Sequence, residues 1–197
     1  DLDLDGDLDV VVANGHIIHN IEAWKRGGTY QQRNQIFENL GDGRFREVAA
    51  SGVDVVRASR GLAVGDLDGD GDLDLVISNC DDRAEVYENR SDRGRFLQVD
   101  LEDRTSGNRA GIGARLELLP GGGSQPGEAQ RHPARAPEVQ VREVRTASSY
   151  LSQNATTVVF GLGAARRVER LEVSWPRGGR LIVHDLPADR RVRLVRE

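Results

Sequence analysis

One loop of alternating aspartates occurs twice in this chain. Positions one, three, five and nine of the loop are aspartate and position six is glycine, first in residues 1–9 and again in residues 66–74. Carboxylates packed this densely repel one another, so the folded chain needs a compensating cation. Oxygen ligands at alternate positions suit a hard ion such as Ca²⁺, which takes about six to eight oxygens at about 2.3–2.6 Å. The glycine allows the positive φ angle with which the chain wraps the ion.

The residue at position twelve restricts the type of calcium loop. An EF-hand needs a glutamate there and flanking helices, whereas this chain has Val12 and Ile77, each in an apolar stretch typical of a buried strand. A dockerin-type loop is disfavoured for the same reason. We therefore expect the side chains at positions one, three, five and nine, and the main-chain carbonyl at position seven, to surround the ion. The predicted side-chain ligands are Asp1, Asp3, Asp5, Asp9, Asp66, Asp68, Asp70 and Asp74, and the predicted carbonyl ligands are those of Asp7 and Asp72.

The similarity between the two copies extends beyond the loops. Residues 8–14 align with 73–79, and residues 36–39 align with 86–89, where both copies end in Glu-Asn. A repeat of about sixty residues made of short strands is typical of a propeller blade or a similar all-β array. The first copy has a polar insertion around residues 16–34, which we expect to be a surface loop.

Two shorter patterns connect the copies. Residues 40–45 predict a tight hairpin in which Asp42 and Gly43 supply positive φ angles. Residues 60–65 predict the strand that leads into the second loop. Each repeat is therefore expected to be built from strands joined by tight turns.

The aspartate pattern stops near residue 90. Alternation and short apolar runs beyond it predict a second series of strands, and no segment has a convincing 3.6-residue period. Residues 120–138 are rich in glycine, proline and charge, which predicts a mobile loop. We expect an all-β chain with two domains, 1–90 and 91–197. The predicted strands of the second half are 95–102, 114–119, 139–145, 157–160, 168–175, 181–183 and 192–195.

Charge and composition exclude several classes of protein. The first 90 residues carry 19 acidic and 9 basic side chains, and the remainder carry 13 and 18. The basic half is not expected to bind nucleic acid, because its arginines are scattered and few aromatic residues are interleaved with them. No apolar run is long enough to predict membrane insertion. Cys80 is the only cysteine, which excludes an internal disulfide, and we expect it to pack as a small apolar residue.

Several motifs resemble known families. The pattern Asp-x-Asp-x-Asp-Gly-Asp-Leu-Asp before a strand resembles the FG-GAP or VCBS repeat, the blade unit of integrin-α-type propellers. Residues 14–16 and 35–45 are similar to the form of this repeat in cartilage-acidic-protein-like chains. Residues from about 96 onward resemble the ASPIC/UnbV domain that follows such repeats. The motifs that carry this second resemblance are residues 108–115, 149–153, 160–163 and 173–176.

The resemblance implies a fold and a function. It implies a partial β-propeller of FG-GAP-type blades whose loops bind Ca²⁺, followed by a small all-β ASPIC/UnbV module. A closed propeller needs at least about four blades, so we read the chain as a segment of a longer protein that packs against further blades of its own chain. The expected function is non-catalytic calcium-binding adhesion, or interaction with an unidentified protein or glycan ligand. The expected location is extracellular, at the cell surface or periplasmic.

Three alternatives remain. The chain could be the carbohydrate-binding accessory domain of a larger secreted enzyme, with Trp24 and Tyr30 of the insertion as the stacking aromatics. It could be an enzyme itself, since residues 149–153 carry two serines and a tyrosine, although no nucleophile elbow surrounds them and a hydrogen-bonded turn explains them equally well. A histidine metal site at His16 and His19 lacks a supporting carboxylate motif. No catalytic and no organic cofactor-binding residue is predicted.

Overall fold

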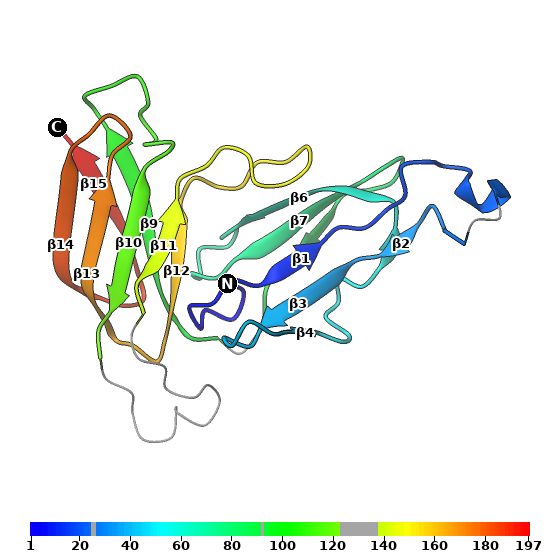
Figure 1. Ribbon diagram of the computed structural model, residues 1–197, viewed down its shortest axis with the longest axis horizontal. Coiled ribbons are helices and arrows are strands. Elements are labelled where there is room, and N and C mark those ends of the chain that lie inside the picture. The colour runs from blue at the N-terminus through cyan, green and yellow to red at the C-terminus, as the bar shows by residue number, and fades with distance from the viewer. Residues whose placement is uncertain (25–26, 92, 123–137) are drawn as a thin grey trace.

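The protein is built almost entirely of β-strands. The computed structural model describes residues 1–24, 27–91, 93–122 and 138–197, and the only helix in these ranges is the short 3-10 helix η1 (Ile21–Trp24). The strands form open sheets rather than a closed barrel, with the repeats on one side and the second half on the other (Figure 1). The expectation of an all-β chain is confirmed.

The two repeats form two three-stranded antiparallel sheets that share one strand pair, β1 with β3 in the first and β7 with β8 in the second. The first has the order β1-β3-β4 and the second β6-β7-β8. Val11 lies opposite Ile36 in the first sheet, and the aligned residues Val76 and Val86 lie opposite each other in the second. The sequence repeat is therefore also a repeat of strand register. The strands are β1 (Val10–Val12), β3 (Gln35–Asn39), β4 (Phe45–Glu47), β6 (Ser59–Gly65), β7 (Asp74–Asn79) and β8 (Glu85–Tyr87).

The insertion in the first repeat is more ordered than a surface loop. It contains η1 and β2 (Gln32–Arg33), and β2 pairs with β5 (Val56–Arg57). Asn34 is fully buried, and its Oδ1 accepts a hydrogen bond of 2.8 Å from the Asn14 main-chain N–H. Polar contacts that include the buried Asn34 thus attach the insertion to the residues that follow β1. The polar composition of the insertion gave no indication of this burial.

The β3–β4 hairpin forms where it is predicted, with a different turn. Positive φ angles occur at Gly41 (74°) and Gly43 (82°), and Asp42 instead accepts a hydrogen bond from the Arg44 N–H through its side chain. Asn39 lies opposite Phe45, so the turn is longer than two residues. The expectation that Asp42 supplies a positive φ is therefore wrong.

The second half folds into two sheets with the orders β11-β10-β13-β14 and β12-β9-β15. All neighbouring strands are antiparallel except β15, which runs parallel to β9. Every strand overlaps one that the sequence predicted. The predicted mobile loop falls largely on residues 123–137, which lie outside the described residues. The strands are β9 (Arg95–Asp103), β10 (Arg115–Pro120), β11 (Gln140–Glu143), β12 (Val158–Gly163), β13 (Arg167–Ser174), β14 (Arg180–Pro187) and β15 (Arg190–Arg196).

The main apolar core lies between these two sheets. It is drawn entirely from residues 97–188, with Phe160, Leu116 and Leu171 fully buried. Burying each such side chain contributes about 1.5–3 kcal/mol. Cys80 does not join any core and is exposed, so the expectation that it packs as an apolar residue is wrong. The sheets of the second half thus enclose a packed core, and the aspartate loops contact one of these sheets.

Candidate metal centre

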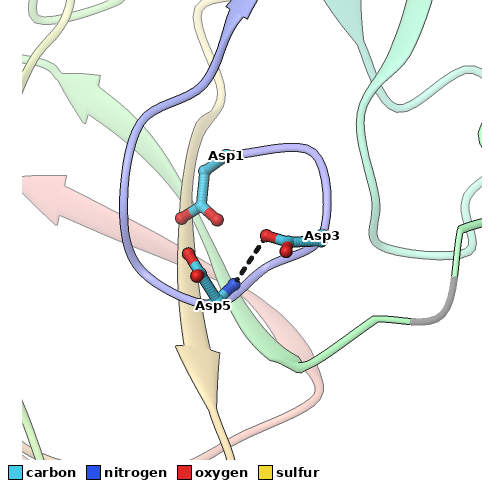
Figure 2. A group of neighbouring side chains, drawn as sticks. All are labelled: Asp1, Asp3 and Asp5. Carbon is cyan, nitrogen blue, oxygen red and sulfur yellow. Dashed lines mark hydrogen bonds between the residues drawn. The ribbon is translucent and has the colours of Figure 1, made fainter. Parts of the chain in front are cut away.

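The first loop directs three carboxylates toward one point. Oxygens of Asp1, Asp3 and Asp5 lie within 4.8 Å of one another, and Figure 2 shows their side chains turned toward the space that the loop encloses. Two ligands on opposite sides of Ca²⁺, each about 2.3–2.6 Å from the ion, are about 4.6–5.2 Å apart. The spacing of the three carboxylates therefore suits a single ion of this size.

The second loop gathers a related set. Oxygens of Asp66, Asp68 and Asp74 lie within 4.8 Å of one another. Both trios include positions one and three, but the first is completed by position five and the second by position nine. Asp9 therefore lies outside the first trio and Asp70 outside the second. Asp70 is drawn to Arg93, whose Nη1 is 2.7 Å from its carboxylate.

The two loops share one pattern of internal hydrogen bonds. In each loop the carboxylate at position one accepts a hydrogen bond from the main-chain N–H of the glycine at position six, and the carboxylate at position three accepts one from the N–H of position five. The carboxylate at position five accepts a hydrogen bond from the N–H of position seven, and the carboxylate at position nine accepts one from the N–H of position two. These bonds fix the carboxylates before any ion arrives. The agreement of all four contacts shows that the loops adopt the same conformation.

The Glu-Asn ending of each repeat has a structural role that the sequence interpretation missed. The Asn39 N–H donates to Asp9 Oδ1, and the Asn89 N–H donates to Asp74 Oδ1, each at 2.9 Å. Their side-chain amides donate to the carbonyls of Leu8 and Leu73 in the same loops. The second strand of each repeat thereby holds position nine of its loop. The asparagine at the same position in both copies is the sequence signal from which this role could have been predicted.

Position six turns the backbone as predicted. Gly6 and Gly71 have φ angles of 105° and 103°. Position four also has a positive φ, 84° at Gly69 and 59° at Leu4. A left-handed conformation disfavours leucine by about 1–2 kcal/mol, and full burial of the Leu4 side chain offsets that penalty.

The position-seven side chains turn toward arginines. Asp72 is buried and pairs with Arg93, and burial raises the pKa of the Asp72 carboxyl to about 6. The other carboxylate oxygen of Asp72, Oδ1, is buried without a hydrogen-bond partner. Asp7 in the first loop is half-buried and interacts electrostatically with Arg142. Burial lowers the pKa of the Arg142 guanidinium, and the negative charge of Asp7 partly opposes that decrease. Arg93 thus holds the Asp72 carboxylate, and the ligand role of the Asp72 main-chain carbonyl stays a prediction.

The donor set fits a hard divalent cation. All candidate ligands are oxygens, and two carboxylates 4.8 Å apart repel by about 3 kcal/mol at an effective dielectric constant of about 20. Bound calcium would supply positive charge that offsets this repulsion and would draw the oxygens together. Within the second loop, the buried Oδ1 of Asp72 also lacks a hydrogen-bond partner.

The other candidate sites have local explanations. His16 Nδ1 accepts a hydrogen bond from the Ile18 N–H, and the Ser152 hydroxyl donates to the Tyr150 carbonyl in a turn closed by a bridge between Ser149 and Ser152. Within the described parts of the chain, groups of three possible metal ligands occur only in the two aspartate loops. No helix in these parts is long and apolar enough to cross a membrane.

Comparison with known families agrees with this architecture. The profile of the FG-GAP-like repeat matches residues 1–77, and the profile named "ASPIC and UnbV" matches residues 104–197. A search of curated proteins finds no match to the chain. FG-GAP-like repeats are propeller-type units typical of extracellular and cell-surface proteins with interaction roles. The chain therefore consists of an FG-GAP-like repeat region followed by an ASPIC and UnbV domain.

Proposed function

We propose that this chain is a non-catalytic, calcium-binding protein that acts in adhesion or in recognition of a protein or glycan outside the cytoplasm. The observation that carries the proposal is the pair of loops with one hydrogen-bond pattern and a carboxylate trio each. Ca²⁺ holds each loop in shape, and the sheets present the interaction surface. A structural role for the ion is favoured because the carboxylate oxygens of each loop already accept hydrogen bonds from main-chain N–H groups of the same loop.

Thermal unfolding tests the calcium sites. Extracellular calcium modules bind with Kd values of about 10⁻⁴–10⁻³ M, so a tenfold excess of Ca²⁺ over Kd adds about 1.4 kcal/mol for each site. For two sites in a chain of this length, we expect 10 mM CaCl₂ to raise Tm by about 5–10 °C relative to EGTA. Asp3→Asn combined with Asp68→Asn should remove most of the shift. An equal Tm in calcium and in EGTA would reject the proposal.

We also propose that further blades of the same chain pair with β1. In the second repeat, β6 pairs with β7 on the side away from β8. The same side of β1 has no paired strand among the described residues. An open edge of this kind favours pairing with another strand.

Glycan binding has one observation in its favour. Trp24 is 52% exposed, as a sugar-stacking residue must be. Tyr30 is less suited, since the Arg60 guanidinium lies 5.6 Å from its ring centroid. A glycan array probed with the wild type and Trp24→Ala distinguishes the alternatives: loss of binding assigns the surface to Trp24, and binding that persists excludes it.

A further inference from the structure

Both aspartate loops lie against the same sheet of the C-terminal domain. The Gly161 N–H of β12 donates to Asp1 Oδ2 at 2.9 Å. The Gln98 side chain of β9 donates through Nε2 to Asp66 Oδ2 at 2.7 Å. Asp1 and Asp66 both occupy position one of their loops. Equivalent ligands of the two repeats are therefore held by one sheet that lies outside the repeats.

The two donors come from adjacent strands. β12 pairs with β9, where Val159 lies opposite Gln98 and Gly161 lies opposite Phe96. Gln98 is only 2% exposed, so water cannot readily replace Asp66 as the partner of its amide. The register of one strand pair thus fixes the positions of both donors together.

The first loop covers the open edge of β12. Alternate N–H groups of an edge strand point away from the sheet, and here they are satisfied by the loop: Gly161 donates to Asp1, and the Gly163 N–H donates to the Leu4 carbonyl at 2.8 Å. A side chain at position 161 would place its Cβ 2.5 Å from Asp1 Oδ2. Glycine at this position permits the close approach of the loop.

We propose that the β12–β9 strand pair forms an outer shell of hydrogen bonds to both calcium loops, so that calcium binding and docking of the C-terminal domain stabilise each other. The inference rests on the proposed calcium binding. A donor to the second oxygen of a ligating carboxylate fixes its orientation, and removing such outer-shell partners weakens metal binding by about 10–100-fold. By thermodynamic linkage the effect is reciprocal: the free energy by which docking of the C-terminal domain strengthens calcium binding equals the free energy by which calcium strengthens docking.

The second loop offers the sharper test because its donor is a side chain. Gln98→Met keeps the length of the side chain and removes the donor. Isothermal titration calorimetry measures the calcium affinity of one loop at a time. The second loop is measured in a chain whose first loop carries Asp3→Asn and Asp5→Asn, and the first loop is measured in a chain whose second loop carries Asp68→Asn and Asp70→Asn. We expect Gln98→Met to weaken the second loop about 10–100-fold and to leave the first loop unchanged. Gln153→Met, at an exposed glutamine of the same domain, is the matched control and should change neither.

A measurement on the unmodified chain covers the case in which Gln98→Met fails to fold. Calcium should slow hydrogen exchange at the Gly161 and Gly163 amides, which donate to the first loop, more than at the Val183 amide of β14. Unchanged affinity of the second loop in Gln98→Met overturns the coupling, as do exchange rates that do not respond to bound calcium. Absence of calcium binding by the wild type rejects the proposed function itself, so the two failures are distinct.

Discussion

Two glycines of the second loop have similar backbone angles and different surroundings. Gly69 (φ 84°) has open space where a Cβ would lie, whereas a Cβ at Gly71 (φ 103°) would overlap the Phe96 ring. Position four tolerates leucine in the first loop, which shows that backbone strain alone is acceptable there. The surroundings of each glycine, and not its φ angle alone, decide whether a side chain can be accepted.

This difference gives a matched pair of variants. Gly69→Ala should lower the free energy of unfolding by about 1–2 kcal/mol through the left-handed backbone. Gly71→Ala should lower it by about 2–5 kcal/mol, because overpacking against Phe96 is added. Urea unfolding of both variants in saturating calcium measures the difference. Equal losses would show that the contact with Phe96 has no energetic weight.

Asp103 illustrates a polar turn at the end of β9. It accepts hydrogen bonds from the Thr105 N–H and hydroxyl at 2.8 and 2.6 Å and from the Ser106 hydroxyl at 2.8 Å. The bond from the Thr105 hydroxyl, with the others, lowers the pKa of the Asp103 carboxyl below its ordinary value. The ionised form is therefore the one that stabilises the fold.

The pH dependence of that contribution follows from its sign. Because the pKa of Asp103 is lower in the folded than in the unfolded chain, its contribution is complete above the unfolded value of about 3.9 and is lost as pH falls through the folded value. Asp103→Asn should destabilise the protein at pH 7, and the gap from wild type should narrow by pH 2.5. Denaturant unfolding at both pH values measures it, on protein from which calcium has been removed beforehand by dialysis. If wild type and Asp103→Asn differ in unfolding free energy by the same amount at both pH values, the stabilising role assigned to ionised Asp103 is contradicted.

Among elements, the two repeats carry their third strand on opposite sides of the strand pair that they share. β7 is flanked on both sides by β6 and β8, whereas β1 pairs with β3 alone among the described residues. β6 leads directly into its loop, and Gly65 at its end lies opposite Asp74 at the start of β7. The equivalent strand for β1 would immediately precede Asp1 and pair in the same register.

A grafted strand tests this equivalence. A copy of residues 59–65 placed before Asp1 should pair with β1 and raise the free energy of unfolding by about 1–3 kcal/mol, about the contribution of one or two newly buried aliphatic side chains. The same residues in scrambled order serve as the control, because alternation decides which side chains face inward. A graft that is no more stabilising than its scramble would exclude pairing at this edge. Differential scanning calorimetry gives the comparison.

The strands themselves were predicted well because their signals are local. Alternation in residues 171–175 places Leu171, Val173 and Trp175 in the core, as the pattern predicts. The hairpin after β3 was predicted with the wrong turn residues, because Gly41 and Gly43 on both sides of Asp42 can each take a positive φ and the local pattern does not choose between them. Cys80 was misplaced because a single residue carries no periodicity.

At the scale of the whole molecule, the first loop protects an edge of the C-terminal domain. Leu4 is fully buried, and the Gly94 N–H donates to the Asp3 carbonyl at 2.7 Å in addition to the contacts of β12. The loop is therefore part of the packing of both halves. Losing it should expose an edge strand that can pair with other chains.

Deletion of residues 1–5 is the corresponding experiment. We expect it to lower the free energy of unfolding by about 4–6 kcal/mol, from the burial of Leu4 (about 1.5–3 kcal/mol) and three lost hydrogen bonds of about 1 kcal/mol each. Leu8→Ala, at a residue that is 52% exposed, should change it little. Calorimetry gives the stability, and light scattering reports association through the exposed β12 edge. Wild-type stability in the deletion would show that the loop is not part of this packing.

Local sequence patterns suffice for the β-strands, the repeated aspartate loops, their glycine turns and the oxygen-bearing side chains that the loops gather. Each arises from residues close together in the chain, where spacing and side-chain chemistry suffice. The contact of Gln98 with Asp66, and that of Gly161 with Asp1, 160 positions away, emerge from the packing of the folded chain. Those contacts depend on how β12 and β9 pair and on which sheet the loops rest against, and no local pattern specifies such long-range packing.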